Sequence, residues 1–160
     1  MRLRTIISGG QTGADQGGLL AAIACGIEHG GWCPKGRRSE DGTIPWMFKL
    51  TEDTSSDYRS RTKLNIRAAD ATIIFIRGVP TGGSRLTAET AIKMRKPLLK
   101  VQIDPKKPLE CAPKIEEFLL RHDPRVINIA GSRESKVPGI QVAVTSVLSF
   151  LIGVLLGEEI

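Results

Sequence analysis

The residues best suited to chemistry lie in a glycine-dense turn near the start of the sequence, Ser8-Gly9-Gly10-Gln11-Thr12-Gly13-Ala14-Asp15. The turn follows a β-branched run, Thr5-Ile6-Ile7, and precedes an apolar stretch of helical composition, Leu19 to Ala24. A strand that turns sharply into a helix presents unpaired backbone N–H groups at the helix N-terminus, where the helix dipole also attracts negative charge. Glycine lets the backbone approach a ligand closely. The turn therefore predicts a site for an anion.

Polar side chains in this turn add to the expected site. Gln11 and Thr12 supply donors, and Asp15 is placed either to cap the following helix or to meet a ligand hydroxyl. The spacing of the glycines matches neither the dinucleotide fingerprint G-x-G-x-x-G nor the phosphate loop G-x-x-x-x-G-K-[ST]. A tight turn without a ligand explains this stretch equally well, so both interpretations stay open.

Two later turns resemble the first, because each follows a predicted strand. Thr81-Gly82-Gly83-Ser84 separates a continuously apolar strand, Ala71 to Ile76, from a helix predicted from Arg85 to about Arg95. Gly131-Ser132-Arg133-Glu134-Ser135 follows a further strand, Val126 to Ala130. Right-handed crossovers place the carboxyl ends of parallel strands at one edge of a sheet, where ligands bind. We therefore expect the three turns to meet at a common edge.

Other charged residues are candidates for the same site. Lys35, Arg37 and Arg38 lie together in a polar segment, 35 to 60, which glycines and prolines break and for which no regular element is predicted. Loops longer than about 15 residues are often functional, and arginine binds phosphate with two parallel hydrogen bonds. The three cations predict a clamp over a phosphate, with a solvated basic loop as the equal alternative. Glu89 suits a ribose hydroxyl or acid–base chemistry, although favourable charge near a helix N-terminus explains it better.

The order of elements predicts an α/β fold, with a Rossmann-like, mostly parallel sheet and helices on both faces. Further elements are a short strand at 30–34, a helix at 61–70, a strand at 98–103 and a helix at 109–121. The length fits a single domain, 1–160. No linker or internal repeat divides it.

The last apolar segment, Ile140 to Leu156, predicts a helix that is buried on most sides. At about 1.5 Å per residue it reaches roughly 25 Å, which is short of the ~30 Å hydrocarbon core of a membrane. A helix this apolar must cover both the sheet and a second surface. We therefore expect a homo-oligomer, a dimer or a tetramer, and no membrane association.

The composition of the chain limits the kinds of partner that we expect. The formal net charge of +6 suits a small acidic ligand or a nucleic acid, but aromatic residues make up only 4% of the chain, too few for a platform that stacks bases. Nucleic acid is therefore the weaker interpretation. The three cysteines form no C-x-x-C pair and indicate neither a disulfide framework nor a zinc site. With no export signal evident at the N-terminus, we expect a cytoplasmic protein that has no metal site of its own.

Taken together, the motifs resemble those of the molybdenum cofactor carrier family, within the Rossmann-like group that includes the lysine-decarboxylase-like, cytokinin-activating proteins. The first turn carries the resemblance with His29-Gly30-Gly31-Trp32-Cys33-Pro34-Lys35-Gly36-Arg37-Arg38, Glu40-Asp41-Gly42, Thr81-Gly82-Gly83-Ser84 and Ala130-Gly131-Ser132-Arg133-Glu134-Ser135. The resemblance implies a Rossmann-like sheet, homo-oligomeric assembly and a pocket for a phosphate-bearing pterin or nucleotide.

The second turn departs from the pattern of the cytokinin-activating relatives, Pro-Gly-Gly-x-Gly-Thr-x-x-Glu. Gly82, Gly83 and Glu89 stand at matching positions. Thr81 replaces the proline, and Arg85-Leu86 stand where Gly-Thr is expected. Arg85 therefore changes the pocket from that of these relatives. Thr87 lies one position after the expected threonine and compensates only in part for its loss.

The function predicted from these observations is binding of an anionic, phosphate-bearing cofactor, with molybdenum cofactor as the leading candidate. One anionic group would be held by the first turn, at Gly9, Gly10, Gln11, Thr12, Gly13 and Asp15. The second turn would hold or orient another, at Gly82, Gly83, Ser84, Arg85 and Thr87, and Arg37 or Arg38 would close over the ligand. The alternative is a nucleotide-processing enzyme that cleaves the N-glycosidic bond of a nucleoside monophosphate, with Glu89 at the ribose.

Overall fold

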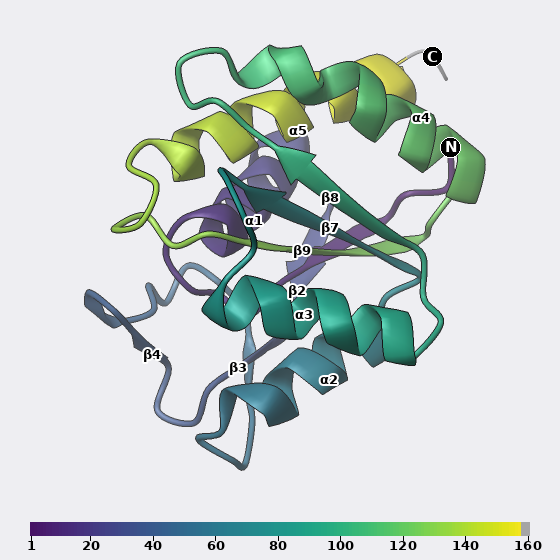
Figure 1. Cartoon of the computed structure of the whole chain (residues 1–160). Coiled ribbons are helices and arrows are strands. Elements are labelled where there is room, and N and C mark those ends of the chain that lie inside the picture. Colours follow the sequence, from purple (N-terminus) through teal and green to yellow (C-terminus); the bar gives the residue numbers. More distant parts are fainter. Residues whose placement is uncertain (158–160) are drawn as a thin grey trace.

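The fold is built on a five-stranded parallel sheet with the strand order β2-β1-β9-β7-β8 (Figure 1). Its strands are β1 (Thr5–Ile7), β2 (Glu28–Gly30), β7 (Ala71–Ile76), β8 (Leu98–Gln102) and β9 (Val126–Gly131). This computed structural model describes residues 1–157, so the last three residues of the predicted domain, 158–160, lie outside the described residues. The predicted Rossmann-like sheet is confirmed.

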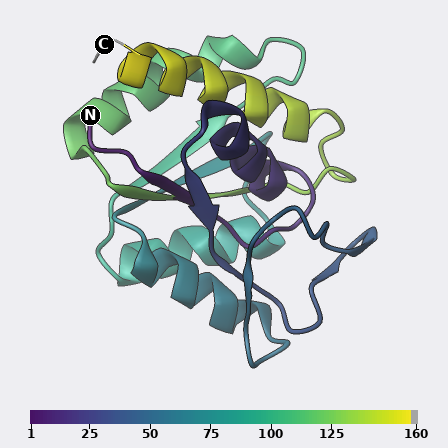
Figure 2. The ribbon, with the colours of Figure 1, turned by 180° about the vertical axis from the view of Figure 1, so that it is seen from behind.

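Helices cover both faces of the sheet, as predicted. One face carries α1 (Ala14–Cys25), α4 (Ala112–His122) and α5 (Ile140–Gly157), and the other carries α2 (Tyr58–Ala68) and α3 (Gly82–Lys93). Figures 1 and 2 show these two layers from opposite sides. A short 3-10 helix, η1 (Pro108–Cys111), leads into α4.

The central strand β7 explains why the sheet is buried on both sides. All six of its residues are buried. Because successive side chains point to opposite faces of a strand, Ile73 and Phe75 join the main core beneath α1, α4 and α5, whereas Ile74 and Ile76 pack with Ala88 of α3. The continuous apolar run thus encodes a strand between two helical layers.

Segment 35–60 is more ordered than the sequence predicts. Two short ladders form, β3 (Trp32–Cys33) with β6 (Thr51–Glu52) and β4 (Arg38–Ser39) with β5 (Gly42–Thr43). Their packing comes from a second small core in which Cys33, Ile44 and Phe48 pack around Leu19 of α1. The expectation of a segment without regular structure was therefore wrong, because a few apolar residues dock it onto the domain.

Several helices begin elsewhere than predicted. The first residues of α1 and α3 come from the glycine turns themselves, at Ala14 and Gly82, whereas α4 begins only at Ala112. The α2 helix begins three residues early, at Tyr58, because the Asp57 carboxylate accepts a hydrogen bond from the Arg59 N–H and caps it. The predicted strand at 30–34 is divided into β2 and β3 at Gly31, which has φ +120°.

The α5 helix is buried on one face only. That face packs along α1, where the Thr145 hydroxyl donates to the Gly17 carbonyl, and it includes Val144, Val147 and Leu151. Side chains on the opposite side are exposed, among them Val142, Phe150 and Val154. The prediction of burial on most sides was therefore wrong for the single chain. Within residues 1–157, α5 is the one helix whose length and composition would let it cross a membrane.

Candidate functional site

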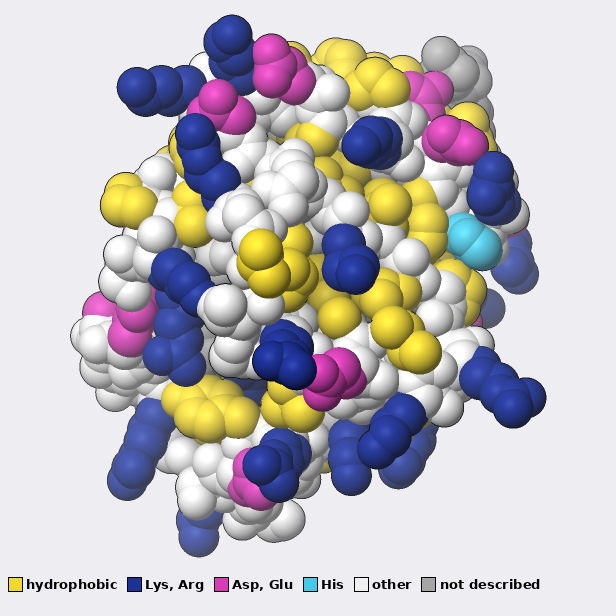
Figure 3. Space-filling view, in the orientation of Figure 1, with side chains coloured by type: hydrophobic (Ala, Val, Ile, Leu, Met, Phe, Trp, Pro, Cys, Tyr) yellow, Lys and Arg dark blue, Asp and Glu magenta, His cyan; other side chains and the backbone are white. Residues whose placement is uncertain are grey.

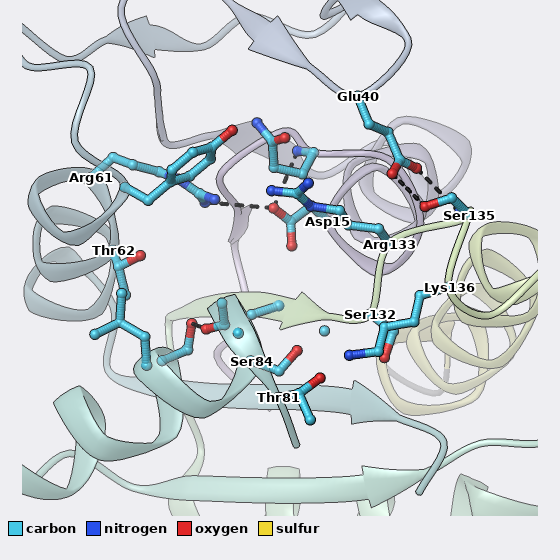
Figure 4. Close-up of a pocket in the computed structure, with 18 of the residues that line it drawn as sticks. Asp15, Glu40, Arg61, Thr62, Thr81, Ser84, Ser132, Arg133, Ser135 and Lys136 are labelled. Carbon is cyan, nitrogen blue, oxygen red and sulfur yellow. Dashed lines mark hydrogen bonds and ion pairs between the residues drawn. The ribbon is translucent and has the colours of Figure 1, made fainter. Parts of the chain in front are cut away.

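A cavity of about 550 Å³ opens at the carboxyl edge of the sheet. Its walls come from the turns after β1, β7 and β9 and from the first turns of α2 (Figure 4). The structure therefore brings the three predicted turns to one place, as the right-handed parallel topology requires.

The lining of the cavity is rich in cations. Five basic residues contribute, Arg59, Arg61, Arg77, Arg133 and Lys136, against the three acidic residues Asp15, Glu40 and Asp57. The surrounding surface has the same sign, since Lys and Arg side chains gather over α2 and α3 in the lower part of Figure 3. This excess of positive charge suits an anionic ligand.

A buried ion pair lies at the inner wall of the cavity. Asp15 is 5% exposed, and its Oδ2 accepts the Gln11 N–H at 3.2 Å and lies 3.6 Å from Arg61 Nη1. Burial raises the pKa of Asp15 to about 6, although Arg61, the Gln11 N–H and Arg133 each act to lower it. Among residues 1–157 nothing donates to the other oxygen, Oδ1, which points into the cavity in Figure 4.

Gly9 makes room for this ion pair. A Cβ at position 9 would lie 1.5 Å from Arg61 Nη1 and 3.1 Å from Asp15 Oδ2. Gly9 does not line the cavity. Its missing side chain admits the guanidinium of Arg61 instead of the ligand expected from the sequence.

The first turn does not offer the cavity the free amides that the sequence predicts. The N–H groups of Gly9 and Thr12 have no acceptor among residues 1–157, but neither residue lines the cavity. The N–H groups of four residues are taken, at 3.1–3.2 Å, by acceptors of the protein itself: Gly10 by Ser8 Oγ, Gln11 by Asp15 Oδ2, Gly13 by Gln141 Oε1 and Ala14 by the Ser132 carbonyl. The Thr12 hydroxyl donates to Glu40. Of the site residues predicted here, only Gln11 and Asp15 line the cavity, so the expected cradle of Gly9, Gly10, Thr12 and Gly13 is not formed.

The second turn does offer free amides. Within the described part of the chain, the N–H groups of Gly82 and Gly83 have no hydrogen-bond acceptor, and the N-cap residue Thr81 makes no capping bond with its side chain. A Cβ at either glycine would meet nothing within 4 Å. Both glycines line the cavity with Ser84 and Thr87. The N-terminus of α3 therefore presents unpaired donors to the cavity, an arrangement that suits an anion.

The predicted clamp residues lie elsewhere. Lys35 and Arg38 are exposed and do not line the cavity. Arg37 is buried, and its guanidinium donates to the carbonyls of Ile44, Pro45 and Phe48. The charge of Arg37 therefore holds the 37–48 loop together. The prediction that Arg37 closes over a ligand was wrong, because its guanidinium is already bonded within this loop.

Arg85 and Glu89 also lie outside the cavity lining. They form an ion pair of 2.9 Å on the surface of α3, with side chains that are 71% and 60% exposed. This geometry leaves Glu89 paired with Arg85 in solvent, away from the position that the enzyme alternative requires.

Sequence reasoning missed the contribution of α2. Tyr58 and Arg61 line the cavity, and the guanidinium carbons of Arg61 and Arg133 lie 5.2 Å and 5.6 Å from the centre of the Tyr58 ring. A signal was present, because α2 carries four cations and no acidic residue although helix N-termini favour acids. Arg133 belongs to the turn after β9 that the sequence placed at this edge, and Lys136 comes directly after that turn.

Glu40 ties the β4–β5 hairpin to the rim of the cavity. Its carboxylate accepts hydrogen bonds from the Ser135 N–H, at 3.1 Å, and from the Ser135 hydroxyl (Figure 4). It also accepts a hydrogen bond from the Thr12 hydroxyl. These bonds hold the pKa of Glu40 below its usual value. The rim is thus fixed from two sides, by the hairpin and by the turn after β9.

Comparison with known proteins agrees with this picture. A crystal structure from Syntrophus aciditrophicus SB, described as a "Putative molybdenum carrier protein", is 40% identical, with a TM-score of 0.88 over 94% of this chain and 96% of that one. A search of curated proteins gives no match. Residues 6–152 match the family model "Circularly permutated YpsA SLOG family". The resemblance to molybdenum carrier proteins is confirmed, and the chain belongs to the circularly permutated YpsA SLOG family.

Proposed function

We propose that this protein binds a small, anionic, phosphate-bearing heterocycle in the cavity at the sheet edge, and that molybdenum cofactor is the ligand. The observation that carries the proposal is the N-terminus of α3, where two amides that find no acceptor among residues 1–157 lie at a cavity lined by five basic residues. The description of the Syntrophus protein as a molybdenum carrier supports the choice of ligand.

The α3 end suits the phosphate. Gly82 and Gly83, whose N–H groups have no acceptor among residues 1–157, line the cavity at the positive end of the helix dipole, and helix ends of this kind bind phosphate in many proteins. Lys136 lines the same cavity and supplies a positive charge, and so does Arg77, whose Nη1 is also paired with Asp104 Oδ1 at 3.0 Å. A dianionic group placed there gains both kinds of interaction.

The size of the cavity fits a cofactor. Its volume of about 550 Å³ lies within the roughly 300–1,000 Å³ that is usual for small-molecule sites. Within residues 1–157 no group of three His, Cys, Asp or Glu side chains is placed to hold a metal ion. We therefore propose that the protein recognises the organic and phosphate parts of the cofactor.

Binding without turnover is the function that the geometry favours. Hydrolysis of a nucleoside monophosphate would need a carboxylate next to the ribose. Glu89, the residue predicted for that role, is paired with Arg85 on the surface. We further propose that the protein works in the cytoplasm as a homo-oligomer, and that the exposed side of α5 forms the subunit contact.

Two substitutions at one position test the proposal. Gly83→Pro removes a single N–H at the start of α3, where helices tolerate proline, whereas Gly83→Ala keeps the N–H and adds a methyl group in open space. Calorimetric titration with isolated molybdenum cofactor should show about 10- to 100-fold weaker binding for Gly83→Pro, since a hydrogen bond to a charged group contributes about 1.5–3 kcal/mol. Gly83→Ala should bind like the wild type. Equal affinity of both variants for the cofactor would contradict the proposal.

A further inference from the structure

The wall of the cavity that faces the N-terminus of α3 has a different chemistry. Figure 4 shows Asp15 on one side of the cavity and Thr81 and Ser84 on the other. The Asp15 side chain is 7% exposed, and its Oδ2 is engaged by the Gln11 N–H and by Arg61. Its Oδ1 receives no hydrogen bond from residues 1–157. This wall therefore presents a hydrogen-bond acceptor, whereas the α3 end presents donors.

A second acceptor without a partner belongs to the same turn. Gln11 is 4% exposed and lines the cavity, and its Oε1 is buried and receives no hydrogen bond from the described residues. Its Nε2 donates to the Arg38 carbonyl at 2.8 Å, which fixes the orientation of the amide. Buried polar atoms without partners are rare in proteins because each one costs free energy. Gln11 and Asp15 belong to one turn, and each has an oxygen that accepts no hydrogen bond from residues 1–157, which points to a missing donor.

The groups around Asp15 determine which kind of hydrogen-bond donor a ligand can bring to it. Arg61 contacts Asp15 directly and Arg133 lies close enough to lower its pKa, so a metal cation would be repelled here. The ring of Tyr58 lies beside both guanidinium groups and lines the cavity. Both guanidinium groups lie over the ring, so a flat, uncharged heterocycle that carries N–H groups can stack on the ring or on one of these guanidinium groups and reach the carboxylate with its edge.

We propose that Asp15 determines specificity by accepting hydrogen bonds from the amino and ring N–H groups of a 2-amino-4-oxopyrimidine ring, the edge shared by guanine and pterin. This inference rests on the proposed function, because it names the part of the ligand that lies opposite its phosphate. The two N–H groups of such an edge lie side by side, so Oδ1 can accept from both while Oδ2 stays engaged by Gln11 and Arg61. The cavity thus recognises both ends of its ligand, the phosphate at the start of α3 and the ring edge at Asp15.

Nucleoside monophosphates that differ only at position 2 of the base provide the test. Binding of GMP, IMP and XMP is measured by calorimetry at pH 7.5. The wild type should bind GMP at least tenfold more tightly than IMP, which lacks the amino group, and should bind XMP least, because its 2-oxo group faces the carboxylate. Asp15→Asn should lose the preference for GMP and bind XMP more tightly than the wild type does, since an amide can donate to the 2-oxo group.

Controls separate this inference from the proposed function. Glu117→Gln removes one negative charge from the surface of α4, far in the fold from the cavity, and should leave the preference for GMP unchanged. Equal binding of GMP, IMP and XMP by the wild type, or no binding of any of them, would overturn the inference. A preference that depends on the 2′-hydroxyl, measured with 2′-deoxy-GMP, and not on the amino group would also overturn it. The effect of Gly83→Pro on binding of molybdenum cofactor would still decide the proposed function.

Discussion

Replacing Asp15 with asparagine is expected to stabilise the fold, even though Asp15 lies at the centre of the candidate site. Burial raises the pKa of this carboxyl to about 6 from its ordinary value of 3.8. A carboxyl whose pKa is higher in the folded state than in the unfolded state opposes folding whenever it is ionised. Asparagine has nearly the same shape and never ionises.

The size of the effect follows from the two pKa values. The penalty is absent below pH 3.8, grows as the pH rises from 3.8 to about 6, and is constant above that. At 1.36 kcal/mol for each pKa unit, the plateau is about 3 kcal/mol. Asparagine imitates the protonated carboxyl, so this value already includes the lost attraction between Asp15 and Arg61. For a domain of this size, 3 kcal/mol corresponds to a rise in Tm of about 6–12 °C.

Urea unfolding at two pH values tests this prediction. The fluorescence of Trp32 and Trp46 reports unfolding, and the free energy of unfolding is compared at pH 7.5 and at pH 4. Asp15→Asn should be more stable than the wild type by about 3 kcal/mol at pH 7.5 and nearly equal at pH 4. Glu117→Gln, which removes an exposed charge, should show no such dependence. A gain that is the same at both pH values, or no gain at pH 7.5, would refute the reasoning.

The remaining predictions concern Gly9 and the exposed side of α5. Gly9→Ala should drive Arg61 away from Asp15 and destabilise the fold by at most about 2 kcal/mol at pH 7.5, because protonation of the carboxyl limits the loss. Combining it with Arg61→Ala should add little in a double-mutant cycle of urea unfolding, and additive losses would argue against the contact. Light scattering after size exclusion should show an oligomer that Phe150→Asp converts to monomer, and a monomeric wild type at micromolar concentration would rule out the proposed interface.

The architecture was predictable from local patterns. The apolar run of β7 and the glycine turns after β1 and β7 specify a parallel sheet, because each is a short segment whose conformation depends mainly on its own residues. The place of the cavity followed from topology, since strands of one direction bring their carboxyl ends together. The helix boundaries were less accurate, because capping by Asp57 and the glycine residues at helix starts decide them.

The detailed chemistry of the site was less predictable because it depends on distant contacts. Gln141, 128 residues from Gly13 in sequence, occupies the amide that a ligand was expected to bind. Arg61 fills the space left by Gly9, and the two residues lie on different elements. No local pattern reports such pairings. The two glycine turns look alike in sequence, but among residues 1–157 it is Gly82 and Gly83 that combine a free N–H group with a place in the cavity wall.

The central claim is that the ligand's anionic group binds to the amides at the start of α3. The most direct measurement is a titration of the ¹⁵N-labelled protein with molybdenum cofactor, followed through its backbone amide resonances. The signals of Gly82 and Gly83 should move most. The signals of Gly10 and Gly13 should change little, because their N–H groups are already bonded within the protein. Large shifts at Gly10 and Gly13 with none at Gly82 and Gly83 would contradict it.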